Sequence, residues 1–287
     1  MLGSIVGVLF DGLAYGMLLF LLSVGLSVTL GMMNFVNLAH CSFAMVGGYA
    51  AVWLSGRAGW PFLATLPAAF LAGAAVSVLL ERTLYRRLYR ASDLDQCLFT
   101  IGIVFISVAA AAYFFGTIQQ SIETPAWLHG ALGAFGIGFS AYRLFLIVVS
   151  LVLAGLLVFA LERTRFGARV RAAVDNQRMA RGLGIDVDRT FMITFALGGG
   201  LAGLGGALAV AMVGLDHQFA FTYLVYVLIV VAVGGLGSIG GSFAAAALLG
   251  ISDMAGKYYL PWLGAFLIYL VMVGLLMWRP VGLFGKR

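Results

Sequence analysis

The sequence predicts an all-α polytopic membrane protein with about nine transmembrane helices. Of its 287 residues, 63% are apolar and only 10% are charged, and the mean hydropathy is +1.07. A soluble globular chain is close to half apolar and about a quarter charged. The apolar residues also gather into segments that approach the roughly 20 residues needed to cross a bilayer. These properties exclude a soluble enzyme, a disordered chain and a nucleic-acid-binding protein, and we expect one transmembrane domain over residues 1–287.

Nine apolar segments are expected to be helices, and three of them are short, with 13, 12 and 14 residues. Because short segments can be half-helices or re-entrant pieces, eight or ten spans are also possible. The first segment follows no basic region, so we expect it to remain as a span and not to be cleaved as a signal peptide. The segments are Ile5–Leu30, Ser42–Leu54, Phe62–Leu80, Leu98–Phe115, Tyr142–Ala160, Phe191–Val213, Thr222–Val233, Ser242–Ala255 and Leu260–Trp278.

The basic residues predict the orientation of these spans. Three segments, 82–90, 163–189 and 279–287, hold 14 of the 17 lysines and arginines. With nine spans, all three fall on one side, and the excess of positive charge makes that side the cytoplasm. The N-terminus is then outside and the C-terminus inside. Asp11 and Asp253 lie near span ends and are expected to be solvated.

Two interruptions of the apolar pattern lie between expected spans. The first, Gly31–Ser42, contains two asparagines, one histidine and one serine, and the second, Gly234–Gly241, contains five glycines in eight residues. Non-helical backbone at membrane depth must be buried in protein or line a wet cavity. Paired interruptions in two parts of a chain point to the translocation site of a transporter. The residues expected to border this pathway are Asn34, Asn37, His40, Ser42, Gly234, Gly235, Gly237 and Ser238.

Each interruption also has a purely structural interpretation. Gly and Ser permit helices to pack closely, which needs no substrate. His40 either lines the pathway or is a buried histidine whose hydrogen bond to a carbonyl fixes the break. Asn34 and Asn37 either face the pathway or cap the helix that follows.

The longest polar stretch, residues 162–190, is expected to be a cytoplasmic loop that contains a pair of short, basic, amphipathic helices. Gly184 is placed as the helix stop. Apolar residues recur along one helix face, and so short a segment cannot bury them by itself. They therefore need either the lipid surface or a groove on a partner protein, and the residues alone leave both open. The apolar positions are Phe166, Val170, Val174, Met179 and Leu183.

Several motifs of other function classes are missing from the sequence. It contains no G-x-x-x-x-G-K-[ST] phosphate-binding loop, so ATP and other cofactors are not expected to bind to this chain. It also has no H-E-x-x-H or G-x-S-x-G motif, no set of Cys and His with metal-ligand spacing, and no span with a row of arginines. An enzyme, a metal centre and a voltage sensor therefore have no candidate residues.

Four motifs follow one another along the chain. They are Asn37-Leu38-Ala39-His40-Cys41 with Gly47-Gly48-Tyr49; Gly167, Arg171-Ala172, Asn176, Met179-Ala180 and Leu183-Gly184-Ile185; Gly234-Gly235-Leu236-Gly237-Ser238-Ile239-Gly240-Gly241; and Arg279-Pro280-Val281-Gly282-Leu283-Phe284-Gly285. In this order they resemble the permeases of bacterial branched-chain amino acid ABC transporters, the LivHM subfamily, over essentially the whole chain. The first motif resembles the LivH half. Cys41 departs from the family's usual Gly, and a side chain there would narrow a site that needs close approach.

The resemblance implies a complex in the bacterial inner membrane, with the N-terminus in the periplasm. Its other members would be a homologous LivM-like second permease, two cytoplasmic ATPase subunits that bind the ATP, and a periplasmic substrate-binding protein. The loop would then dock on an ATPase. The docking residues implied are Phe166, Gly167, Val170, Arg171, Ala172, Val174, Met179, Ala180, Leu183, Gly184 and Ile185.

The leading hypothesis is therefore an ABC importer permease for branched-chain or other small hydrophobic amino acids. A second hypothesis keeps this importer class with urea, an amide or another small solute as cargo. A third is a self-powered secondary transporter, which should carry an ionisable residue inside the membrane. Asp11 and Asp253 are poorly placed for that role.

Overall fold

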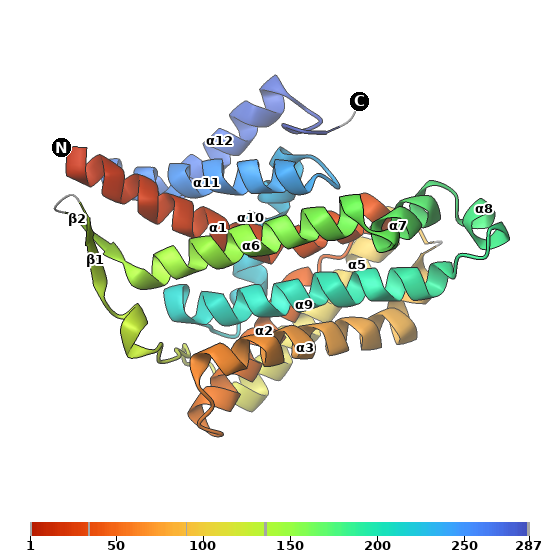
Figure 1. Cartoon of the computed structure of the whole chain (residues 1–287), viewed down its shortest axis with the longest axis horizontal. Coiled ribbons are helices and arrows are strands. Elements are labelled where there is room, and N and C mark those ends of the chain that lie inside the picture. Colours follow the sequence, from red (N-terminus) through yellow and green to blue (C-terminus); the bar gives the residue numbers. More distant parts are fainter. Residues whose placement is uncertain (1, 34, 90, 135–136, 286–287) are drawn as a thin grey trace.

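The computed structural model describes residues 2–33, 35–89, 91–134 and 137–285 of this all-α polytopic membrane protein. Its long helices run between two ends of the molecule (Figure 1). Among the described residues, six helices are long and apolar enough to cross a membrane. They are α1 (Leu2–Met33), α3 (Phe62–Leu80) with its extension to Leu88, α5 (Asp93–Phe115), α6 (Ala141–Arg163), α9 (Val187–Val213) and α11 (Ile239–Tyr259).

Three further apolar helices are shorter: α2 (His40–Gly56), α10 (Phe219–Gly234) and α12 (Gly264–Trp278). Together the nine helices coincide with the nine expected segments, but length alone supports only six of them as spans. The three segments expected to be shortest are longer in the structure. The third of them is α11, which has 21 residues where the sequence predicts 14. Its bounds extend because Ser238 caps its start and the helix continues past Ala255 through Lys257 to Tyr259.

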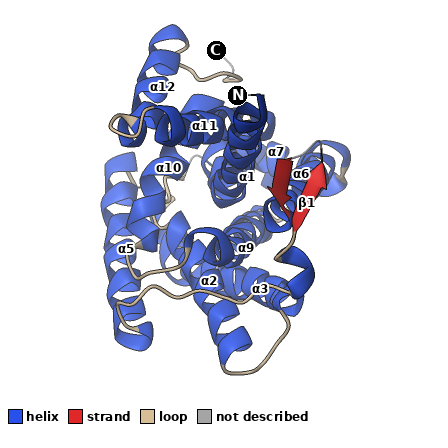
Figure 2. Cartoon of the chain, turned by 90° about the vertical axis from the view of Figure 1, so that its left-hand side faces the viewer, coloured by secondary structure: helices blue, strands red, loops and turns tan. Residues whose placement is uncertain are grey.

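Helix α1 lies at the centre of the bundle, where it packs against α6, α9, α10 and α11 (Figures 1 and 2). Small residues make these contacts close. A Cβ built on Gly12 would come within 2.6 Å of the Ile251 Cα on α11, and one built on Gly16 within 2.9 Å of the Ala247 Cα. Pairs of small residues four apart allow helix backbones to approach in this way inside membranes. The buried core gathers around the Met17–Leu22 turns of α1.

One end of the molecule carries the strands and the N-terminus. Strands β1 (Ala131–Ala134) and β2 (Ile137–Ser140) pair antiparallel, and η2 (Ala126–Leu128) is a single 3-10 turn before them. Strand β2 contacts α1 and α6, and Figure 2 shows the two strands beside α6. These strands were not predictable from the sequence, because each has only four residues and no alternating apolar pattern.

The opposite end carries the basic segments. The third helix continues through the π-helical turn η1 (Glu81–Tyr85) into α4 (Arg86–Leu88), and α7 (Arg165–Asp175) and α8 (Gln177–Gly182) project at this end in Figure 1. In the C-terminal tail, the Leu283 N–H donates a hydrogen bond to the Val233 carbonyl at 2.7 Å. An ion pair joins Arg86 to Asp188. The ion pair places two of the three arginine-rich segments side by side.

Asp253 corrects one expectation from the sequence. It is not solvated: only 1% of it is exposed, and its carboxylate lies 2.5 Å from the Lys257 Nζ one turn later on α11. Lys257 also lies over the Tyr15 ring, 5.4 Å from its centre. Buried acidic side chains are usually paired with a cation in this way. Asp11 is half-buried and is paired with Arg143.

Candidate translocation and coupling site

The first interruption is shorter than the sequence predicts. Helix α1 continues to Met33 and α2 begins at His40, so the described non-helical residues are Phe35–Ala39. Asn34, which was expected to border the pathway, lies outside the described residues. The chain reverses direction between α1 and α2. The evidence is the close approach of His40 to Gly25 of α1: a Cβ built on Gly25 would lie 2.7 Å from the His40 ring. His40 therefore returns to a level two turns back along α1.

Polar side chains of α5 satisfy the backbone of this segment. The Val36 N–H donates to Gln96 Oε1 at 2.9 Å, and the Leu38 N–H donates to Thr100 Oγ1 at 3.1 Å. In a membrane, unpaired backbone groups are costly, so a non-helical segment survives only with such partners. Gln96 also donates to the Leu88 carbonyl at 3.2 Å. Helix α5 thus fastens the interruption to the end of the third helix.

The described pathway residues of this segment, Asn37, His40 and Ser42, are buried. Asn37 accepts the Ala39 N–H at 3.1 Å just before α2, which has no side-chain cap, and its Nδ2 has no partner among the described residues. His40 is hydrogen-bonded to the backbone of Leu22, and its Nε2 has no partner there either. Ser42 shares a hydrogen bond with Ser107 of α5 at 2.7 Å. Two polar atoms are therefore left unpaired inside the bundle, directly beside the break.

An apolar groove of about 560 Å³ opens between α2 and α5, next to this cluster. Ser107, the partner of Ser42, lines its inner part. Tyr49 and Phe115 stack across it with their ring centres 4.1 Å apart, and Trp53 and Phe114 line it further along. Cys41, the departure from the family motif, does not line the groove and packs in the core. The groove offers apolar walls with a few hydroxyls, which suits a small apolar solute.

The second interruption is a tight turn between α10 and α11. Gly235 and Gly237 have φ of +93° and +76°, values that favour glycine. Ser238 Oγ accepts the Gly241 N–H at 3.0 Å and caps α11. A Cβ built on Gly234 would meet the Ser242 nitrogen at 2.6 Å. These backbone angles and close contacts explain the glycines of this turn by conformation and packing.

Two other segments cover this turn. A Cβ built on Gly235 would lie 2.5 Å from the Gly285 nitrogen in the C-terminal tail, and one built on Gly237 would lie 2.9 Å from the Gly31 Cα on α1. His40 contacts α1 at Gly25 and Gly237 contacts it at Gly31, nearly two turns further along. The structure therefore places the two interruptions at different levels of the same central helix.

In the loop, α7 is seated on the body of the chain. Thr164 caps it, and Gly167 packs so closely on the Leu161 carbonyl that a Cβ would overlap it. Arg171 donates to the same carbonyl. The prediction that the apolar face of the loop needs a partner outside the chain is thus wrong for Val170. This residue is fully buried within the chain, together with Gly167 and Ala173. The buried face follows spacings of three residues, because glycine and alanine let α7 lie close to α6 and α9.

The end of the loop stays uncovered. Met179 is 65% exposed and Leu183 is 79% exposed, and Gly184 has φ of +80° as the predicted helix stop requires. The Ile185 N–H donates to the Ala180 carbonyl and the Gly184 N–H to the Arg181 carbonyl, both at 3.0 Å, which closes α8. Of the other predicted docking residues, Ala180 is buried, Phe166, Ala172 and Ile185 are half-buried, and Arg171 and Val174 are exposed.

The α5 residues Gln96, Thr100 and Ser107 are functional-site neighbours that were not predicted. They recur at intervals of four and seven residues, which places them on one helix face. Isolated polar side chains on one face of an apolar span predict a buried partner, and this signal was available in the sequence.

Comparison with known proteins agrees with this architecture. The family described as the branched-chain amino acid transport system permease component matches residues 8–276. The chain belongs to this permease family. It is 29% identical to a protein named probable branched-chain amino acid transport permease protein LivH of Methanocaldococcus jannaschii, covering 97% of this chain and 92% of the relative.

The permease is also similar to proteins named LivM. It is 27% identical to the LivM permease protein of Salmonella typhimurium, over 93% of this chain and 68% of the relative. A solved structure of PsaBC from Streptococcus pneumoniae in complex with Fab aligns with 96% of this chain and 89% of that chain, at 14% identity and a TM-score of 0.44. By its motifs and its relatives, the permease is LivH-like.

Proposed function

We propose that this permease is one of two membrane subunits of an ABC importer for branched-chain or other small hydrophobic amino acids. Its arginine-rich end faces the cytoplasm, its N-terminus faces the periplasm, and all nine apolar helices lie in the bilayer. A LivM-like permease forms the other half of the pathway, because the chain is similar to both halves of such systems. Two ATPase subunits and a periplasmic binding protein complete the complex.

The observation that carries this proposal is the uncovered tip of α8. Met179 and Leu183 stand exposed on a helix whose neighbour, α7, is held by buried contacts. Apolar side chains presented from a fixed support suit a groove on a protein, where truncation of an anchor costs about 2 kcal/mol or more. A helix on lipid would instead depend on its arginines. We therefore assign the tip to ATPase docking.

Co-purification with the ATPase subunits tests this assignment. Met179→Ala and Leu183→Ala should each lower the amount of bound ATPase about 30-fold, which corresponds to about 2 kcal/mol. Arg178→Lys is the matched control, because it lies beside Met179 and keeps the charge, and it should retain the ATPase. If both truncations keep the ATPase, the tip does not dock on it, and the lipid-surface interpretation applies instead.

We also propose that substrate moves along the groove between α2 and α5, with Asn37, His40 and Ser42 at its inner end. The unpaired Asn37 Nδ2 and His40 Nε2 support this, since buried polar atoms without partners mark sites of ligand or water. Gly234, Gly235, Gly237 and Ser238 would border the cytoplasmic end. Ala50→Trp should fill the groove and block transport in a permease that still assembles. Normal leucine uptake by that variant would exclude this route.

The cargo follows from the chemistry of the groove and the names of the relatives. Aromatic and aliphatic walls favour an apolar side chain over urea or an amide, which offer little apolar surface. With the cognate binding protein, leucine should stimulate ATP hydrolysis and urea should not. Stimulation by urea alone would assign the importer to the second cargo class.

A further inference from the structure

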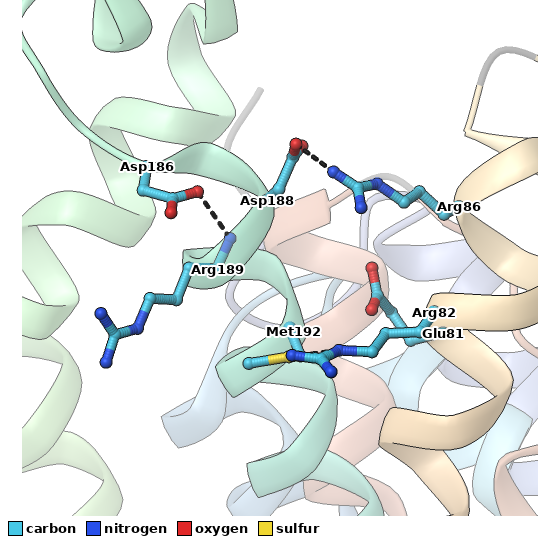
Figure 3. Close-up of a pocket in the computed structure, with 7 residues that line it drawn as sticks. All are labelled: Glu81, Arg82, Arg86, Asp186, Asp188, Arg189 and Met192. Carbon is cyan, nitrogen blue, oxygen red and sulfur yellow. Dashed lines mark hydrogen bonds and ion pairs between the residues drawn. The ribbon is translucent and has the colours of Figure 1, made fainter.

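A polar pocket of about 740 Å³ lies at the arginine-rich end, between the extension of α3 and the start of α9 (Figure 3). Three arginines, three carboxylates and Met192 line it. The function proposed above uses none of these side chains. Their formal charges cancel, so the question is which of them are already occupied by contacts within the chain.

The carboxylates are all satisfied. Glu81 is buried and accepts a hydrogen bond from the Tyr89 hydroxyl at 2.9 Å. Burial and the Glu81 carboxylate raise the pKa of this Tyr89 hydroxyl, so it remains protonated as the donor. Asp186 Oδ1 accepts the Arg189 backbone N–H at 2.9 Å, which caps α9. Asp188 lies between Arg86 and Arg181 and pairs with both.

Two of the arginines are not satisfied in this way. Within the part of the chain that the structure describes, neither Arg82 nor Arg189 forms an ion pair, and the Arg82 Nε donates only to the Met192 sulfur at 3.1 Å. Figure 3 shows Arg82 leaving the helix that carries Glu81 and Arg189 leaving α9. The two guanidinium groups thus line one pocket from two elements, Arg82 beside Met192 and Arg189 on the other side of α9 in Figure 3, and neither is held by an ion pair among the described residues.

The pocket continues into an apolar groove. A second cavity, of about 580 Å³, follows the outer face of α3 along Leu71, Ala74, Ala75, Val78 and Leu79, and Arg82 lines both cavities. The opposite face of α3 packs on α9 through the buried residues Ala69, Gly73 and Ser77. Leu71 and Leu79 remain 66% and 60% exposed. Small alanines between larger leucines hollow this outer face.

The dimensions and charges of the joined cavities match one leaflet of a membrane. Leu71 to Arg82 spans about 17 Å along the helix at 1.5 Å per residue. Half of a hydrocarbon core of about 30 Å is about 15 Å. The groove therefore presents apolar surface over the depth of one leaflet and ends at unpaired cations. Basic pockets next to membrane helices on the cytoplasmic side are suited to anionic lipid head groups.

We propose that this surface binds an anionic phospholipid of the inner leaflet. The phosphodiester accepts hydrogen bonds from the Arg82 and Arg189 guanidinium groups, and one acyl chain lies in the α3 groove. The assignment of the inner leaflet rests on the orientation proposed above, whereas the binding itself does not require the ATPase or transport. A free phosphate would leave the groove empty, and a zwitterionic lipid would bring no net negative charge to the two arginines.

Photo-crosslinking of the purified permease in phosphatidylcholine nanodiscs tests the proposal. The probes are phosphatidylglycerol and phosphatidylcholine with a diazirine on the acyl chain, each at the same low fraction. We expect phosphatidylglycerol to label the 71–79 segment at least about five-fold more than phosphatidylcholine, because each arginine near the surface contributes about that factor. Ala75→Trp should abolish this labelling by filling the groove, without a change of charge.

Two arginine variants identify the head-group site. Arg82→Gln and Arg189→Gln should each lower phosphatidylglycerol labelling about five-fold, and Arg82→Lys should retain most of it. Arg87→Gln is the matched control, because Arg87 is exposed on α4 but does not line the pocket. A monodisperse gel-filtration peak checks that each variant is folded. An equal loss in Arg87→Gln would show a general effect of surface charge and would overturn the site.

Three further results would contradict the proposal. Equal labelling by the two lipids would remove the head-group preference. Competition by inorganic phosphate at about millimolar concentration would assign the pocket to a free anion. Labelling that is present in the isolated permease but absent in the assembled transporter would show that a protein subunit covers this face of α3. Labelling that persists in the assembled transporter supports the lipid.

Discussion

At the scale of single residues, the first interruption depends on a few hydroxyl and amide groups of α5. Thr100 is the clearest case, because its Oγ1 accepts the Leu38 N–H and donates to the Gln96 carbonyl at 2.7 Å. Its side chain is buried. Removal of the hydroxyl would leave the partly buried Leu38 N–H without its partner, and an unpaired donor costs about 1–3 kcal/mol.

Thr100→Val should therefore lower the thermal stability of the purified permease by the equivalent of about 1–3 kcal/mol. Thr83→Val is the matched control, since the Thr83 hydroxyl is exposed and donates only within its own helix, to the Leu79 carbonyl. Thermal unfolding in detergent, followed by fluorimetry, measures both. Equal melting temperatures for the two variants would show that α5 does not hold the interruption.

Some properties of single residues could be predicted from the sequence and others could not. Gly184 as a helix stop was predictable, because glycine at the end of an amphipathic pattern favours positive φ. The burial of Val170 was not predictable, since it depends on how closely Gly167 lets α7 approach Leu161. The burial of Asp253 was not predictable from its place near the end of an expected span, since it depends on the pairing with Lys257 one turn later.

At the scale of elements, the coupling loop is a fixed base with an exposed tip. Helix α7 is buried on one face, and Gly184, which follows α8 after Leu183, has left-handed backbone. The orientation of Met179 and Leu183 depends on that ending, because Leu183 follows the last turn directly. A residue with a Cβ in this conformation is strained by about 1–2 kcal/mol.

Gly184→Ala should therefore reduce ATPase co-purification, although no neighbouring atom blocks a Cβ at this position. Gly182→Ala is the matched control: that glycine lies in α8, has open space around it and lacks the positive φ. It should leave ATPase binding unchanged or slightly stronger, because alanine favours helix. If both variants bind the ATPase equally well, the left-handed stop does not orient the tip.

The helices themselves were well predicted, because apolar length is a direct consequence of the bilayer. Their ends were less predictable. Caps such as Ser238 and Asp186 extend helices beyond the apolar residues. The groove between α2 and α5 could not be predicted, since it depends on how two helices far apart in sequence lie against each other.

At the scale of the whole molecule, the arginine-rich segments and the N-terminus lie at opposite ends (Figure 1). This arrangement gives the proposed orientation a simple test. In a background with Cys41→Ala and Cys97→Ser, His129→Cys should react with a membrane-impermeant maleimide in intact cells. Arg178→Cys should react only after permeabilisation. The reverse pattern would invert the orientation and remove α8 from the cytoplasm.

The central claim is that ATP hydrolysis by docked partners drives uptake through this chain, and reconstituted transport tests it most directly. Proteoliposomes should contain this permease, its partner permease and the two ATPase subunits, with ATP inside and the binding protein outside. We predict leucine uptake that requires both ATP and the binding protein and is lost in Met179→Ala. Leucine uptake by the permease alone, without ATP and driven by an ion gradient, would contradict the account and favour a secondary transporter.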